Sequence, residues 1–133
     1  MIVLIALDEN GGMCFHGRRQ SRDKLLCARI LSLAEGETLR MNAYSAPLFA
    51  GESAVKVSEA FLSEAAEGDF CFVETAPLAA YADKIEKIIV YRWNRAYPAD
   101  FFPDIDLSAW KRLSSAEFAG SSHPIITEEI YIK

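Results

Sequence analysis

The sequence has few of the residues that build disulfide frameworks and metal centres. It contains three cysteines and two histidines, with no C-x-x-C, H-x-H or H-E-x-x-H motif. An odd number of cysteines without paired spacing argues against both disulfide and zinc frameworks. We therefore expect Cys14, Cys27 and Cys71 to be core thiols, and we predict no metal site.

Positive charge and long apolar runs are also scarce. The net charge is −5, whereas general nucleic-acid binders need an excess of Lys and Arg facing the phosphates. No run approaches the ~18 apolar residues of a membrane span, and the opening MIVLIALDEN lacks the basic start of a signal peptide. These absences argue against general nucleic-acid binding and membrane insertion, and they favour a cytoplasmic protein.

The length and apolar content indicate a single domain over residues 1–133. Hydrophobic residues make up 51% of the 133 positions, enough for a core in a domain of the usual ~100 to 150 residues. No internal repeat, low-complexity tract or linker argues for a second domain.

Buried-strand patterns alternate with helical patterns along most of the chain. The unbroken apolar run from Ile2 to Leu7 predicts a strand that is buried on both faces. Ser21 predicts the cap of a helix that Gly36 ends. Further strands are predicted at 38–41, 70–73 and 87–93, and further helices at 58–68 and 75–84. The pattern predicts an α/β fold with a mostly parallel central sheet and flanking helices.

The C-terminal third changes to the period-two alternation of antiparallel strands. WKRLSSAEF and ITEEIYIK, joined by AGSSHP, predict a terminal hairpin. Ser122 and His123 in this loop do not predict a nucleophile and its base. Adjacent residues on a strand-like loop are expected to point apart, and no G-x-S-x-G motif is present.

This order of elements, with three local matches, resembles the dihydrofolate reductase family. FPDIDLSAW, residues 102–110, looks like the family's F-P-x-x-x-x-x-x-W segment before the terminal hairpin. MIVLIAL followed by Gly12 and Met13 is similar to the family's first strand and mobile loop, and Asp23 falls within one residue of its active-site carboxylate. The resemblance spans nearly the whole chain and implies a dihydrofolate reductase-like fold, shortened at residues 50–57.

Asp23 is the candidate catalytic residue that this resemblance implies. In the family the carboxylate hydrogen-bonds the pteridine and supports its protonation, which requires a partly desolvated acid. An Asp two residues after Ser21 is also favoured at a helix start, by free backbone N–H groups and the helix dipole. The sequence leaves both interpretations open.

Arg18, Arg19 and Arg22 precede the first predicted helix and are candidate ligand-binding residues. A guanidinium group binds phosphate or carboxylate bidentately, and a helix N-terminus adds to this attraction. The alternative is a solvated loop whose arginines pair with the abundant Asp and Glu. The resemblance adds Ser45, a hydroxyl where the family has Thr, and Tyr91, at a pocket-facing polar position of the family's fourth strand.

The family's ligand anchors are poorly matched. The resembled enzymes hold the dinucleotide pyrophosphate on a Gly-Gly turn, because only Gly lets the backbone approach a phosphate so closely. Glu74 and Thr75 stand at that turn, and Ala43 replaces a basic residue that meets the adenosine phosphate. The Arg that clamps the folate glutamate is also missing from the shortened segment. The cofactor is unknown, NADPH is disfavoured by Glu74 and Thr75, and ordinary dihydrofolate reduction is not expected.

Three functions remain, and the sequence leaves open whether the protein is an enzyme. The favoured hypothesis is a small protein that binds a nucleotide-like or pterin-like anion between Asp23 and the arginines, without hydride transfer. The second is a divergent flavin- or NAD(P)H-dependent reductase. The third is a non-catalytic interaction domain or homo-oligomer that uses the aromatic segment near Trp93 and Tyr97.

Overall fold

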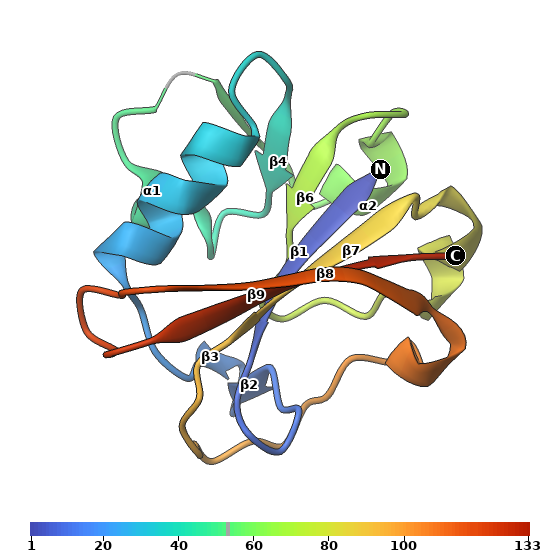
Figure 1. Ribbon diagram of the computed structural model, residues 1–133. Coiled ribbons are helices and arrows are strands. Elements are labelled where there is room, and N and C mark those ends of the chain that lie inside the picture. Colours follow the sequence, from blue (N-terminus) through green and yellow to red (C-terminus); the bar gives the residue numbers. More distant parts are fainter. Residues whose placement is uncertain (53) are drawn as a thin grey trace.

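A seven-stranded mixed sheet forms the centre of the molecule (Figure 1). The structure is a computed structural model that describes residues 1–52 and 54–133. The strand order is β5-β4-β6-β1-β7-β9-β8, in which the first five are mutually parallel and the last two form an antiparallel hairpin. The strands are β1 (Ile2–Leu7), β4 (Leu39–Met41), β5 (Val55–Val57), β6 (Phe70–Phe72), β7 (Lys87–Arg92), β8 (Lys111–Phe118) and β9 (Ile126–Ile132). The predicted α/β class, with its mostly parallel sheet and C-terminal hairpin, is confirmed.

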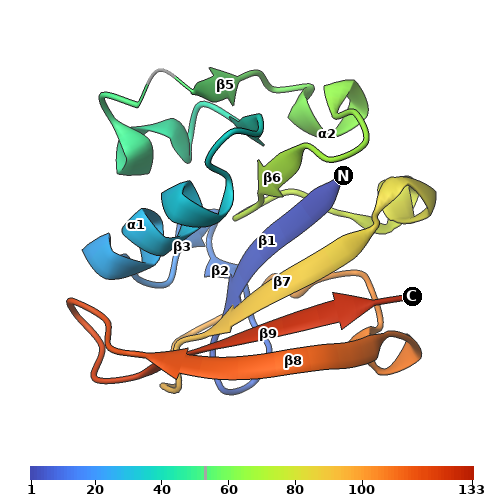
Figure 2. The ribbon, with the colours of Figure 1, turned by 45° about the horizontal axis from the view of Figure 1, so that its top comes forward.

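Short helical segments cover the two faces of this sheet (Figure 2). The segments are α1 (Lys24–Leu33), α2 (Phe61–Glu64) and three 3-10 helices, η1 (Ala46–Phe49), η2 (Ala79–Lys84) and η3 (Leu107–Ala109). One face packs against α1 and η1, and the other against α2 and the chain around η2 and η3. None of the helices in the described part of the chain is long and apolar enough to cross a membrane.

The two-faced burial explains the unbroken apolar run of β1. Val3, Ile5 and Leu7 belong to one core cluster, while Leu4 belongs to the other. Because successive side chains of a strand point to opposite faces, a strand covered on both sides needs apolar residues at every position.

Three local predictions differ from the structure. The helix expected at 58–68 is the four-residue helix α2. Ser21 does not cap the first helix; Asp23 does, because its carboxylate accepts the backbone N–H groups of Leu25 and Leu26 at 3.0 and 3.1 Å. The helix expected at 75–84 is the shorter 3-10 helix η2. A segment of six residues closes with i→i+3 bonds more readily than with a full α-helix.

Three short strands were not predicted from the sequence. β2 (Cys14–Phe15) and β3 (Arg18–Arg19) pair as a hairpin within the loop that links β1 to α1. The shortened segment at 50–57 still leaves room for β5, a three-residue edge strand beside β4. Two- and three-residue strands carry too little periodicity to be recognised in a sequence.

Candidate functional site

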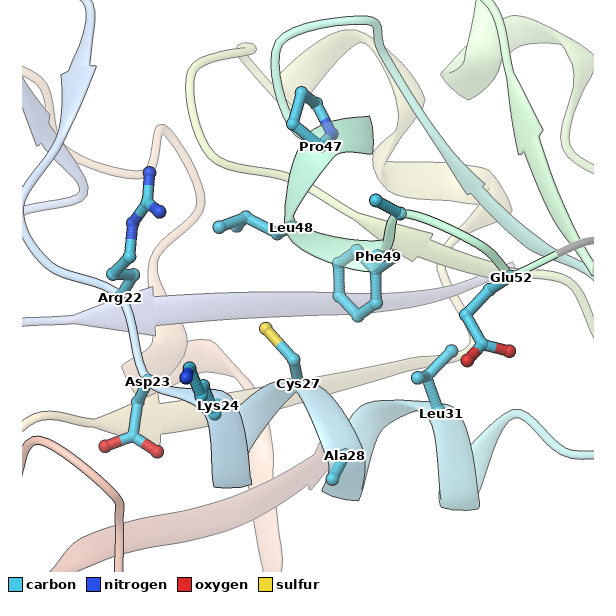
Figure 3. Close-up of a pocket in the computed structure, with 11 residues that line it drawn as sticks. Arg22, Asp23, Lys24, Cys27, Ala28, Leu31, Pro47, Leu48, Phe49 and Glu52 are labelled. Carbon is cyan, nitrogen blue, oxygen red and sulfur yellow. The ribbon is translucent and has the colours of Figure 1, made fainter.

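An open groove of about 350 Å³ lies between α1 and the segment around η1 (Figure 3); we call it the α1 groove. Its helix side carries Cys27 and Leu31, and its opposite side carries Leu48 and Phe49. These apolar walls lie on the face of the sheet that α1 covers. Leu26 and Ile30 of α1 pack against the sheet, and the adjacent residues Cys27 and Leu31 face η1. The remaining lining residues are Arg22, Asp23, Lys24, Ala28, Pro47, Ala50 and Glu52.

The charges of the α1 groove are arranged along its length. The exposed Arg22 and Lys24 lie at the beginning of α1, and the exposed Glu52 lies near the other end, beside Leu31 (Figure 3). The sulfur of Cys27 points into the space between them. Burial, aided by the nearby carboxylates of Glu74 and Asp23, raises the pKa of this thiol to about 11. Cys27 is therefore a neutral thiol at physiological pH, and the middle of the groove is uncharged.

Asp23 adjoins the α1 groove, but its carboxylate is turned away from it (Figure 3). The side chain is fully buried, and beyond its two helix-cap bonds it accepts the backbone N–H groups of Ser121 and Ser122 at 2.9 and 2.8 Å. Burial alone would raise the pKa of the carboxyl group, yet these backbone donors outweigh burial and hold the pKa well below its usual range. The structure thus places Asp23 as an ionised anchor between α1 and the β8–β9 loop.

The loop reaches Asp23 because residue 120 is glycine. A Cβ atom at Gly120 would lie 2.4 Å from Oδ2 of Asp23 and 2.8 Å from the carbonyl oxygen of His123. Both distances are shorter than a van der Waals contact, so only glycine permits this approach.

Arg19, Ser45 and Glu74 form a second cluster, which we call the latch. Nε and Nη2 of Arg19 donate to Oε2 and Oε1 of Glu74 at 2.9 and 3.0 Å, and the Ser45 hydroxyl donates to Oε1 at 2.7 Å. Arg19 also lies 4.4 Å from the centre of the Tyr44 ring and donates to the Tyr44 carbonyl oxygen. Burial opposes the charge of Arg19, but the hydrogen bonds with Glu74 raise its pKa. Two predicted ligand residues, Arg19 and Ser45, are thus brought together around the chain's own carboxylate.

The latch closes the crevice at the carboxyl ends of β1 and β6, where α/β sheets commonly bind ligands. Beneath it remains a cavity of only about 10 Å³, lined in part by Ala6, Met13 and Trp93, about the space of one water molecule. Glu74 and Thr75, at the edge of this crevice, do not fit the pyrophosphate of a nicotinamide dinucleotide. Where the resembled enzymes have a Gly-Gly turn, Glu74 presents a carboxylate, and Thr75 adds a second side chain.

Tyr91 lies outside both the α1 groove and the crevice. It is buried beneath α1, its ring 6.2 Å from that of Phe118, and its hydroxyl has no hydrogen-bond partner among the described residues. Burial, followed by the charge of Glu128, raises its pKa. Glu128 is itself held by Arg29 through bonds of 2.7 and 2.9 Å. The structure does not bring Tyr91 together with the other predicted ligand residues.

Arg18 is exposed on the β2–β3 hairpin, beside a different groove of about 480 Å³. This β2–β3 groove is also lined by Phe15, His16, Tyr97 and Pro98. The three predicted arginines therefore separate: Arg22 faces the α1 groove, Arg19 is bound in the latch, and Arg18 borders the β2–β3 groove.

His123 was assigned no role from the sequence, and the expectation that it points away from Ser122 was wrong. Its Nδ1 atom lies 3.2 Å from both Ser122 Oγ and Asp23 Oδ2, and its Nε2 atom lies 2.8 Å from the hydroxyl of Tyr97. The only sequence feature that pointed to these contacts of His123 was the GSSH stretch, which places two serines before the histidine in a loop. Its partner Asp23 is 100 residues away in the chain, a separation that no local pattern reveals.

No group of three or more His, Cys, Asp or Glu side chains is placed to hold a metal ion within residues 1–52 and 54–133. The three cysteines are free thiols, of which Cys14 and Cys71 are buried.

Comparison with known proteins connects this architecture to one fold. No protein-family model and no curated protein sequence matches the chain. Among solved structures, it is similar to dihydrofolate reductase from Enterococcus faecalis, described as a complex with NADP(H) and RAB-propyl, with a TM-score of 0.68 and 14% sequence identity. The match covers 98% of this chain and 94% of the other. The chain therefore has a dihydrofolate reductase-like fold over nearly its whole length, as the sequence resemblance implied.

Proposed function

We propose that this protein binds an anionic, nucleotide-like or pterin-like small molecule in the α1 groove and does not carry out ordinary dihydrofolate reduction. The observation that carries the proposal is the groove itself, an open space of about 350 Å³ with apolar walls. A space of this size matches the usual range of small-molecule sites, roughly 300 to 1,000 Å³.

The charge distribution supports an anionic ligand with a flat apolar body. Leu31 and Leu48 offer an apolar surface, while Arg22 and Lys24 offer positive charge at the beginning of α1. Glu52 would repel an anion from the other end. A bound molecule would therefore place its phosphate or carboxylate near Arg22 and its ring system between Cys27 and Leu48.

The latch argues against ordinary dihydrofolate reduction with NADPH. Glu74 occupies Arg19 and Ser45 with its own carboxylate, and the cavity beneath is about 10 Å³. A nicotinamide ring could reach the end of β1 only after the latch opened. A ligand of the α1 groove needs no such opening, because that groove is already formed.

A ligand screen with matched variants tests the proposal. Melting temperature is measured with NADPH, dihydrofolate, FMN and ATP, for the wild type and for Ala28→Trp, which fills the α1 groove without removing a polar contact. Leu25→Trp is the matched control, since Leu25 is exposed on the same helix but does not line the groove. The double variant Arg22→Ala/Lys24→Ala tests the charge, and Lys56→Ala/Lys87→Ala removes the same charge elsewhere.

We expect at least one of these compounds to raise the melting temperature of the wild type and of both controls. The shift should disappear in Ala28→Trp and fall in the Arg22/Lys24 variant, with no oxidation of NADPH by dihydrofolate. Absence of any shift, or a shift that survives Ala28→Trp, would refute binding in this groove. NADPH-dependent turnover of dihydrofolate would refute the second half of the proposal.

A further inference from the structure

Asp23, His123 and Tyr97 form a hydrogen-bonded chain that runs from the buried Asp23 to the half-buried Tyr97, and we call it the relay. Oδ2 of Asp23 lies 3.2 Å from Nδ1 of His123, and Nε2 of His123 lies 2.8 Å from the Tyr97 hydroxyl. The carboxylate and the imidazole are almost completely buried, with 0% and 1% of their side-chain surface exposed. The three residues come from the start of α1, the β8–β9 loop and the segment after β7, so the relay exists only in the folded protein (Figure 1).

The surrounding hydrogen bonds determine which atoms of the relay donate and which accept. The Asp23 carboxylate is held in its ionised form by the N–H groups of Ser121 and Ser122, and it can only accept. Nδ1 of His123 must therefore donate toward Asp23, which leaves Nε2 as an acceptor for the Tyr97 hydroxyl. The Ser122 hydroxyl donates to the Arg22 carbonyl oxygen, so it turns a lone pair toward Nδ1.

The imidazole is also fixed in orientation. Trp93 stacks on it with ring centres 4.5 Å apart and planes inclined by 26°. The groups in contact with His123 are thus one carboxylate, two hydroxyls and an indole ring. Asp23 is the only charged member among these contacts.

A hydroxyl, an imidazole and a buried carboxylate in this order make a proton relay. When the hydroxyl gives up its proton, the imidazole accepts it, and the carboxylate stabilises the resulting imidazolium. Asp23 does not itself take the proton, because its N–H donors favour the charged carboxylate. Tyr97 stands at the outer end of this relay and forms part of the wall of the β2–β3 groove.

We propose that Tyr97 is an activated phenol that transfers protons to and from a small aromatic anion bound in the β2–β3 groove. Phe15 offers an aromatic surface in that groove and Arg18 a guanidinium group for a carboxylate or phosphate. A hydroxyl proton of the bound molecule passes to Oη of Tyr97, while the proton of Tyr97 passes to Nε2 of His123. The products are the deprotonated ligand and an imidazolium paired with Asp23.

Covalent labelling with 4-(fluorosulfonyl)benzoate tests this proposal, because the probe is a small aromatic anion with an electrophilic sulfur. The phenol oxygen of Tyr97 bonds to sulfur, fluoride leaves, and the phenol proton passes to His123. Tyr81, also half-buried, is the internal reference. We expect Tyr97 to label at least about ten-fold faster than Tyr81, and His123→Gln to abolish most of that difference, since a positioned base contributes 10² or more.

Two further measurements separate activation from a structural role. The labelling rate of the wild type should fall with decreasing pH as His123 becomes protonated, with the midpoint that NMR of its ring gives. Arg18→Ala should slow labelling by the carboxylate probe while leaving labelling by uncharged phenylmethanesulfonyl fluoride unchanged. The wild-type pH profile stands even if His123→Gln does not fold.

Only Asp23 of the relay adjoins the α1 groove, and its carboxylate is turned away from that groove, so this proposal does not depend on the proposed function. Ala28→Trp should leave Tyr97 labelling unchanged, whatever it does to ligand binding. Equal labelling of Tyr97 and Tyr81, a rate in folded His123→Gln equal to that of the wild type, or a pH profile that does not follow His123 would each overturn the proposal.

Discussion

Replacing Asp23 should destabilise the protein far more than an ordinary helix cap does. The carboxylate caps α1, which is worth about 1 kcal/mol. It also accepts the N–H groups of Ser121 and Ser122, and hydrogen bonds to charged groups are worth about 1.5 to 3 kcal/mol each. Because these bonds share one carboxylate, they do not add in full. We expect Asp23→Ala to lower the free energy of unfolding by about 3 to 4 kcal/mol.

Urea denaturation and thermal melting measure this loss. For a chain of this size, the expected fall in melting temperature is about 10 to 15 °C. Asp23→Ser separates the two roles, because serine keeps the helix cap but cannot reach the β8–β9 loop in the same way; it should recover only about 1 kcal/mol. Asp106→Ala is the control. Asp106 caps η3 by accepting the Ser108 N–H group but is exposed, so its loss should stay below about 1 kcal/mol.

The pH dependence provides an independent check on the same carboxylate. The pKa of Asp23 in the folded protein lies below its ordinary value of about 3.9, so its stabilisation is complete above that pH. The difference between wild type and Asp23→Ser should therefore shrink as pH falls below about 4, by up to 1.4 kcal/mol per pH unit. Equal losses for Asp23→Ala and Asp106→Ala, full recovery in Asp23→Ser, or a difference that is constant in acid would refute the reasoning.

Three further substitutions test the latch, the loop and the buried tyrosine. Glu74→Gln leaves the partly buried Arg19 without its carboxylate, so unfolding free energy should fall by about 2 kcal/mol and hydrogen exchange of the β2–β3 hairpin should accelerate; a change below about 0.5 kcal/mol would mean an ordinary surface ion pair. Gly120→Ala places a methyl group against Asp23 and should cost about 2 kcal/mol in urea denaturation; unchanged stability would contradict the close approach. Tyr91→Phe removes a buried hydroxyl without a partner, so stability should stay within about 1 kcal/mol of wild type or rise, and a larger loss would show that the hydroxyl is bonded.

Most strands of the sheet can be predicted from the amino-acid sequence alone. β1 spans the same residues as the apolar run that predicts it, Ile2 to Leu7, and the terminal hairpin follows from period-two alternation. A strand covered on both faces needs apolar residues at each position, so the pattern that predicts it lies within a few consecutive residues. Together with the three local matches to the family, at FPDIDLSAW, at MIVLIAL with Gly12 and Met13, and at Asp23, they predict the dihydrofolate reductase-like fold.

The partners of the polar side chains in the candidate sites follow from the three-dimensional fold and not from the sequence. Asp23 is bonded to a loop about 100 residues away, and Arg19 to Glu74 at a separation of 55 residues. In the sequence, the three arginines form one group; in the fold they border two different grooves and the latch between β3 and β6. The physical reason is that a charged side chain takes the partner that packing places nearest, and burial makes leaving it unpaired costly. Hydrophobic periodicity therefore predicts which residues form the core, while the pairing of buried charges depends on contacts between distant segments of the chain.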